Sequence, residues 1–129
     1  MIDKLQFCLK SAVYFPSKEE ISQNIPLCFA EFADVMVVLD CIEIHIQRPK
    51  ELCCQQATYS RYKSDFTIKF MTGVTPGGMI SFVSKAYGGK ISDDAIFQQS
   101  KILDLLEKGD AIMVDKGFRV EKLCKKKRY

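Results

Sequence analysis

The segment from Val35 to Ile46 constrains the fold most, because apolar and β-branched residues dominate it. Its first five residues are apolar on both faces, which is typical of a central strand covered on both sides. From position 40 onward the pattern alternates, with Ile42 and Ile44 in the even row and polar residues in the odd row. Asp40 is the one charge in the even row, and a carboxylate there needs a hydrogen bond, an ion pair or a metal ion.

The residues after this strand predict an antiparallel hairpin. A polar connection over residues 50–65 leads to strand-like segments at 67–74 and 79–85. Between the two segments stands Thr75-Pro76-Gly77-Gly78, whose composition favours a tight turn. Gly88-Gly89 then breaks the second strand of the hairpin.

A helix and a short strand follow the hairpin. Ser92 is a candidate N-cap for a helical stretch running towards Leu106, with an interruption near Ser100, and Gly109 suits the C-cap. Residues 111–114 form a short buried strand. A helical crossover of this length favours a last strand parallel to the first. The order predicts a mixed α/β sheet.

The chain divides into three parts by composition. Residues 1–34 predict a helical lead-in, where Ser17 and Glu20 have the spacing of a capping box. Residues 35–123 form the predicted core, and residues 124–129 a basic tail. A Lys/Arg-rich tail is typical of a nuclear import signal or a phosphate contact, and equally of a charged, solvated end.

Composition limits the class of protein. At 129 residues, with 47% hydrophobic and 27% charged residues, the chain fits one globular domain at most. A net charge of +3 is too small to argue for nucleic acid by itself. Six cysteines without regular spacing or a signal peptide indicate reduced thiols, and no stretch reaches the ~20 apolar residues of a membrane span. We expect a soluble protein that is not secreted and not in a membrane, in the nucleus or otherwise the cytoplasm.

Two aspartates form the candidate site. Asp115 follows the last strand, and Asp40 lies in the later part of the first. In open α/β sheets, functional residues gather beyond the carboxyl ends of parallel strands. Two carboxylates on adjacent strands repel unless a cation lies between them, and ligands that are all oxygen favour Mg²⁺ or Mn²⁺. Such ions catalyse phosphoryl transfer.

The chain resembles a known family from Phe15 to Leu123. The resemblance rests on Pro16-Ser17 with Pro26-x-Cys28-Phe29, on VVLDCIEIHIQRP (37–49), on ATYSRYKSDFTIKFMTGVTPGGMISFVSKAYGGKISD (57–93) and on ILDLLEKGDAIMVDKGF (102–118). These motifs are similar, in order and spacing, to the DDE superfamily endonucleases of harbinger-like transposases, including transposase-derived proteins that carry THAP domains.

The resemblance implies an RNase H-like fold, a divalent metal ion, and two aspartates plus a glutamate that cut and join DNA. The first family aspartate corresponds to Asp40 in Leu-Asp-Cys, and the second to Asp115 in Asp-Lys-Gly-Phe. The family's Ser-Asp corresponds to Ser92-Asp93. Asp93 is thus a candidate metal or outer-sphere residue, with a helix cap as the alternative.

The sequence departs from the family pattern at two places. Ile42 stands where the family usually has Thr. The third carboxylate is expected tens of residues beyond Asp115, on a helix, whereas this chain ends at Tyr129 and Glu121 is too close to Asp115 in sequence. We therefore expect a C-terminally truncated core, inactive alone, whose exposed sheet face is covered by a protein partner or an oligomer.

Three hypotheses follow. The chain is a truncated nuclease domain that retains metal-binding aspartates, or a domesticated non-catalytic module that binds DNA or protein, or a fragment that does not fold alone. Glu43 and His45 are interpreted as ordinary residues on the polar face of the strand, with an approach of Glu43 to the site as the alternative. The segment from Tyr59 to Lys63 could contact a DNA backbone, although a solvated loop explains it as well.

Overall fold

The computed structural model describes residues 1–119 and residue 124. The helices of the described part are α1 (Ile2–Leu9), α2 (Lys18–Gln23), the 3-10 helix η1 (Leu27–Phe32), α3 (Leu52–Thr58), α4 (Asp93–Ser100) and the 3-10 helix η2 (Ile102–Leu105). The strands are β1 (Val35–His45), β2 (Tyr59–Ser60), β3 (Asp65–Val74), β4 (Ile80–Val83), β5 (Tyr87–Gly88) and β6 (Ala111–Val114). No helix in these residues is long and apolar enough to cross a membrane.

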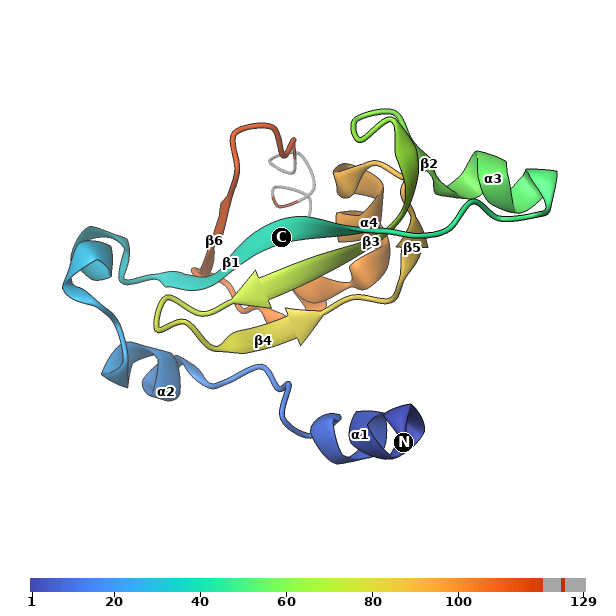
Figure 1. The fold of residues 1–129 in the computed structure, drawn as a ribbon. Helices are drawn as coiled ribbons and strands as arrows, with labels where there is room; N and C mark the ends of the chain where they lie inside the picture. Colours follow the sequence, from blue (N-terminus) through green and yellow to red (C-terminus); the bar gives the residue numbers. More distant parts are fainter. Residues whose placement is uncertain (120–123, 125–129) are drawn as a thin grey trace.

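All six strands join one mixed sheet in the order β2-β3-β1-β6, with β4 and β5 also paired to β3 (Figure 1). β1 and β3 pair antiparallel from Val38–Val74 to His45–Thr67. β6 pairs parallel with the first half of β1, after the crossover through α4. The predicted order of strand, antiparallel hairpin, helix and parallel strand is confirmed, and this mixed α/β sheet is consistent with an RNase H-like fold.

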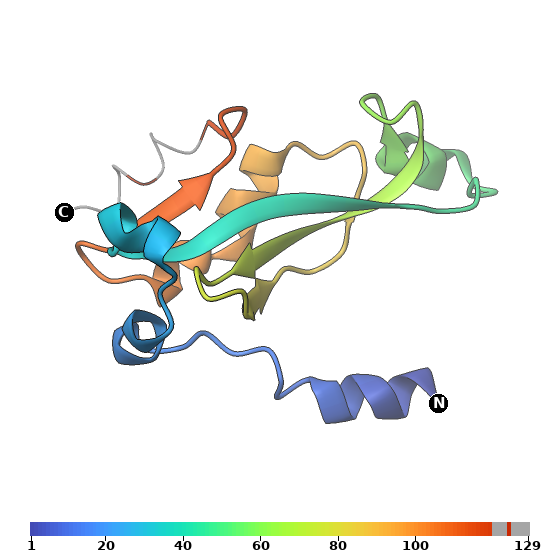
Figure 2. The ribbon, with the colours of Figure 1, turned by 60° about the vertical axis from the view of Figure 1, so that its left-hand side comes forward.

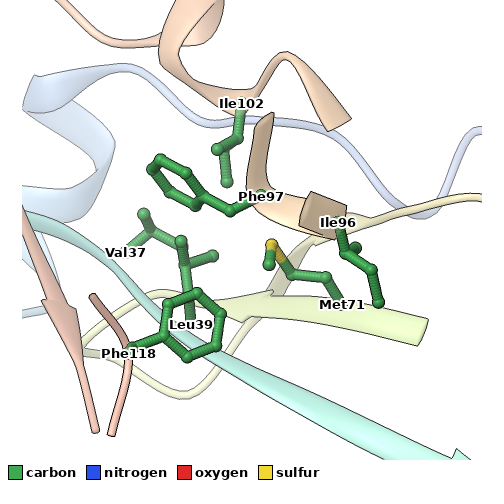
Figure 3. Close-up of a cluster of buried hydrophobic side chains, with 7 residues drawn as sticks. All are labelled: Val37, Leu39, Met71, Ile96, Phe97, Ile102 and Phe118. Carbon is green, nitrogen blue, oxygen red and sulfur yellow. The ribbon is translucent and has the colours of Figure 1, made fainter. Parts of the chain in front are cut away.

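The core lies between one face of the sheet and helix α4. Alternation along β1 and β3 directs one row of apolar side chains towards the helix. These side chains meet residues from α4, η2 and the turn after β6 (Figure 3). The buried cluster consists of Val37, Leu39, Met71, Ile96, Phe97, Ile102 and Phe118.

The opposite face of the sheet is open beyond position 39. The even row of β1 contains Asp40, which is exposed, followed by Ile42 and Ile44 at 49% and 54% exposure. The row is apolar apart from Asp40, as the sequence indicates, but beyond Val38 it is largely exposed, because the helix of the described core packs against the odd row. The Asp40 carboxylate is therefore exposed to solvent.

The helical stretch after Ser92 agrees with the sequence prediction at its interruption but not at its C-cap. The interruption near Ser100 is confirmed, since α4 ends there and Lys101 adopts a left-handed conformation with φ of 55°. This reversal lets η2 place Ile102 in the core at 0% exposure. The prediction that Gly109 caps the helix is wrong. Gly109 lies in the turn before β6, with φ of 97°.

Two elements fall where the sequence predicted only a polar connection. Helix α3 buries none of its residues, so it lacks the apolar periodicity by which a helix is recognised. Its first turn is held by hydrogen bonds from the Gln55 amide to the Glu51 carbonyl (2.9 Å) and from the Gln55 side chain to the Pro49 carbonyl (2.8 Å). β2 follows α3 directly and pairs with the start of β3.

The glycines after β4 allow a close approach rather than ending a strand. Gly88 is part of β5, and a Cβ there would overlap the carbonyl oxygen of Ala57 at the end of α3. A Cβ on Gly89 would overlap Oγ1 of Thr67. Glycine at both positions therefore lets β5 pass against α3 and β3.

The N-terminal residues form the helical pieces expected of them. The capping box of α2 is confirmed: the Glu20 amide donates to Ser17 Oγ (3.3 Å), and the Ser17 amide donates to the Glu20 carboxylate (2.9 Å). Helix α1 buries no residue and lies apart from the sheet in both views (Figures 1 and 2).

Candidate metal centre

Asp40 and Asp115 take corresponding positions on adjacent parallel strands. Leu39 of β1 is the register partner of Val114, the last residue of β6; Asp40 follows Leu39 within β1, and Asp115 directly follows β6. Neighbouring strands lie about 4.8 Å apart, so the two backbones present their carboxylates from a shared edge of the sheet. The predicted adjacency of these two strands is confirmed.

Both carboxylates are exposed and partly fixed by the backbone. Asp40 Oδ1 accepts a hydrogen bond from the Cys41 amide (2.8 Å), and Asp115 Oδ1 accepts one from the Lys116 amide (2.7 Å). Within the described part of the chain, the Oδ2 atoms of Asp40 and Asp115 accept no hydrogen bond. Each aspartate can therefore offer an oxygen to a cation while its other oxygen keeps the side chain oriented.

The turn that carries Asp115 is anchored in the core. The Phe118 amide donates to the Asp115 carbonyl (2.9 Å), which closes the Asp-Lys-Gly-Phe turn. The Phe118 ring is buried and meets Phe97 of α4 edge-on, with centroids 6.3 Å apart and an interplanar angle of 83°. The phenylalanine of this motif thus positions the aspartate through packing.

The structure does not bring Asp93 to the same site. Asp93 is the first residue of α4, and its Oδ1 lies 3.0 Å from Lys69 Nζ. It also interacts with Cys41, which belongs to the odd row of β1, whereas Asp40 belongs to the even row. The preceding Ser92 caps α4: its side chain accepts a hydrogen bond from the Ala95 amide (3.3 Å), which confirms the predicted N-cap.

Lys69 is the centre of a buried ionic network that the sequence analysis missed. Its ammonium lies 3.4 Å from Glu43 Oε1 and 3.0 Å from Asp93 Oδ1, and donates to the Ile91 carbonyl (3.0 Å). Glu43 also accepts from the Thr67 hydroxyl (2.9 Å). The network ties β1, β3 and the start of α4 together. Glu43 and Lys69 face each other in the β1–β3 register, and no local sequence pattern shows that pairing.

The pKa values of Glu43 and Lys69 are both shifted towards the charged forms. Burial acts to raise the pKa of Glu43, but hydrogen bonds from Ser60 and Thr67 and the charge of Lys69 outweigh it, so the pKa is lowered. Burial acts to lower the pKa of Lys69, but its hydrogen bond and charge interaction with Asp93, together with Glu43, outweigh it and raise the pKa.

Cys41 is kept as a neutral thiol beside the candidate centre. Burial, followed by the charge of Asp93 and a hydrogen bond to it, raises the pKa of Cys41 to about 12. Cys41 also belongs to the odd row of β1, on the opposite face of the strand from Asp40. His45 is also engaged elsewhere, with Nδ1 3.2 Å from Asp65 Oδ2. The donors at the paired strand ends are therefore oxygens.

The donor set fits a hard divalent cation that keeps several water ligands. Mg²⁺ binds through one or two protein carboxylates while water completes its octahedron. No group of three or more His, Cys, Asp or Glu residues able to hold a metal ion occurs among residues 1–119 and 124. The two carboxylates at the paired strand ends, Asp40 and Asp115, are of the type that would suit such an ion.

Comparison with known protein families identifies the family of this chain. A family model described as DDE superfamily endonuclease matches residues 39–128, which is most of the chain. The match begins one residue before Asp40 and includes Asp93 and Asp115. No curated protein and no solved structure gives a significant match. The chain belongs to the DDE superfamily endonuclease family.

Proposed function

We propose that this transposase-derived, nuclease-type domain holds a divalent metal ion, Mg²⁺ or Mn²⁺, between Asp40 and Asp115, and that DNA is the substrate of the ancestral site. The observation that carries the proposal is the parallel register of Leu39 with Val114, which puts the two aspartates at adjacent positions. We expect their carboxylates to lie roughly 4–7 Å apart, within reach of a shared ion. Asp93 is at most an outer residue of this centre, since it is paired with Lys69.

The two aspartates would orient the ion and the phosphate it binds. A bound Mg²⁺ or Mn²⁺ polarises a phosphoryl oxygen and stabilises the charge that develops during in-line displacement. Hydrogen bonds from the Cys41 and Lys116 amides hold one oxygen of each carboxylate. This fixed orientation lowers the cost of arranging the ligands when the substrate arrives.

Two carboxylates are fewer than a two-metal nuclease uses. The ancestral reaction, cutting and joining DNA as in harbinger-like transposases, requires a third carboxylate that the described residues do not provide at this centre. Misplacing a reacting group by ~1 Å can cost about 10²-fold in rate. We propose that this chain binds metal weakly and does not cleave DNA by itself.

A non-catalytic role on the same scaffold is the second candidate. The observation that favours it is the open sheet face, where Ile42 and Ile44 are about half exposed. An apolar face of this kind is typical of a surface that another protein, or a second copy, covers. A nuclear location would suit either role, and its basis is the basic tail, which lies outside the described residues apart from Cys124.

Calorimetry with Mn²⁺ tests the metal centre. The wild-type chain is expected to bind Mn²⁺ weakly, and Asp40→Asn or Asp115→Asn is expected to remove the binding heat, because each substitution deletes one of the two charged ligands. Asp104→Asn, an exposed aspartate in η2, serves as the matched control. Equal heats for wild type and Asp40→Asn would place the ion elsewhere.

A cleavage assay on the same proteins tests the ligand count. Supercoiled plasmid incubated with the wild-type chain and Mn²⁺ is expected to remain uncut, because one ion of the pair would be poorly held. Nicking that disappears in Asp40→Ala/Asp115→Ala would contradict the expected inactivity. It would mean that a further carboxylate, from this chain or a second copy, completes the site.

A further inference from the structure

The far end of the β1–β3 ribbon carries a group of basic and aromatic side chains, which we call the ribbon lobe. Its members are Arg48, Tyr59, Arg61, Tyr62, Lys63 and Phe66. β6 pairs only with the first five residues of β1, and the lobe begins after the last residue of that strand. Figures 1 and 2 show the lobe elements β2 and α3 extending away from β6. The lobe is therefore distinct from the candidate metal centre.

The lobe has an excess of positive charge. The segment 46–66 contains four basic residues, at positions 48, 50, 61 and 63, and two acidic ones, Glu51 and Asp65. Asp65 is engaged by His45, with Nδ1 and Oδ2 3.2 Å apart. None of the salt bridges formed by the described residues includes any of the four basic side chains. Their charges thus remain available to an anionic partner.

The tip of the lobe presents an aromatic face beside a cation. Tyr62 is 86% exposed in the turn between β2 and β3, and Lys63 Nζ lies 5.1 Å from its ring centroid. The turn is well anchored, because the Lys63 amide donates to Oγ of the buried Ser60 (3.3 Å) and Ser64 reverses the chain with φ of 53°. The fold therefore fixes the backbone of the tip while the Tyr62 ring contributes almost nothing to the core.

The base of the lobe is ordered by stacking and a hydrogen bond. The Arg48 guanidinium lies 5.9 Å from the Phe66 ring centroid and donates to the Gln55 side chain (3.2 Å). Tyr59 packs edge-on against Phe66, with centroids 5.4 Å apart. This arrangement holds Arg48 in place before any ligand binds, which reduces the entropy lost on binding.

We propose that the ribbon lobe binds single-stranded DNA, with an unpaired base stacked on Tyr62 and neighbouring phosphates contacted by Arg61, Lys63 and Arg48. Aromatic faces beside cations are the features with which proteins bind single strands without reading sequence. Ile46, where the lobe begins, is six positions along the extended chain from Asp40, roughly 20 Å.

The proposal rests on DNA as the substrate of the proposed function, but its test is independent of metal. Fluorescence anisotropy of a labelled single-stranded oligonucleotide, in EDTA, would compare the wild-type chain with variants of the lobe. Tyr62→Ala is expected to weaken binding about tenfold through loss of base stacking, whereas Tyr62→Phe keeps it. Arg61→Ala/Lys63→Ala is expected to reduce the slope of log affinity against log salt by about 1.4, since each single-strand phosphate contact contributes about 0.7.

Matched controls lie outside the lobe. Tyr14→Ala removes a tyrosine that is 50% exposed, and Lys10→Ala removes an exposed lysine next to α1. Both are expected to leave affinity unchanged. No binding by the wild-type chain, or equal affinities for Tyr62→Ala and Tyr14→Ala, would overturn the proposal. Because EDTA removes divalent ions, either result would leave the metal centre at Asp40 and Asp115 untouched.

Discussion

Replacing Lys69 with methionine is expected to lower the free energy of unfolding by about 3–5 kcal/mol. The substitution leaves the Glu43 side chain, which is only 8% exposed, without its cation, and it also frees Asp93 at the start of α4. An unpaired buried charge costs far more than the ion pair itself contributes, so the loss comes mainly from Glu43. Urea denaturation followed by circular dichroism measures the effect, and Lys90→Met, at an exposed lysine, is the control.

The pH dependence of this loss follows from the two pKa shifts. The pKa of Glu43 is lowered, so its contribution is complete above the ordinary value of 4.5 and disappears as pH falls through the lowered pKa. The pKa of Lys69 is raised, so its contribution is complete below 10.5 and disappears as pH rises through the raised pKa. The effect of Lys69→Met should therefore be largest between about pH 4.5 and 10.5 and shrink in acid.

A second substitution distinguishes the stability lost through an unpaired charge from the stability lost through poorer packing. Glu43→Gln in the Lys69→Met background removes the stranded carboxylate and is expected to recover part of the stability. A loss below about 1 kcal/mol for Lys69→Met, or no recovery in the double variant, would contradict a stabilising network.

Phe97→Ala is expected to destabilise the fold by about 3–5 kcal/mol, because it empties the space between α4 and the sheet. Phe97 is 1% exposed and belongs to the same buried cluster as Val37 and Leu39. It is also the edge-on partner of Phe118, so its loss would loosen the turn that carries Asp115. Thermal or urea denaturation measures the change.

The control for this prediction is an exposed phenylalanine. Phe7 of α1 is 82% exposed, and Phe7→Ala is expected to change stability by no more than about 0.5 kcal/mol. Similar losses for the two variants would mean that α4 does not form the core against the sheet. A loss below about 1.5 kcal/mol for Phe97→Ala alone would mean that the neighbouring side chains collapse into the cavity.

Local patterns predicted the elements that carry the candidate site. The strand around Asp40, the hairpin turn, the capping box at Ser17 and the parallel strand before Asp115 each have a signal within a few residues of sequence. The crossover rule then placed the two aspartate-bearing strands side by side, as the register shows. Helix α3 had no such signal, because it buries none of its residues.

What the sequence could not show depends on contacts between distant segments. The exposure of Asp40 could not be predicted, because alternation defines two rows of a strand but tertiary packing decides which row a helix covers. Glu43 and Lys69 are far apart in sequence, and only the β1–β3 register brings them together with Asp93. Local sequence patterns hold no information on that register.

Paramagnetic broadening by Mn²⁺ in the amide spectrum of the 14.7 kDa chain locates the ion directly. We predict that substoichiometric Mn²⁺ selectively broadens the amide signals of residues 39–41 and 114–116, and that Asp40→Asn/Asp115→Asn abolishes this broadening. Both strand ends should be affected together, because Leu39 and Val114 are register partners. Broadening centred on other residues, or broadening at these strand ends that persists in the double variant, would contradict a metal centre shared by Asp40 and Asp115.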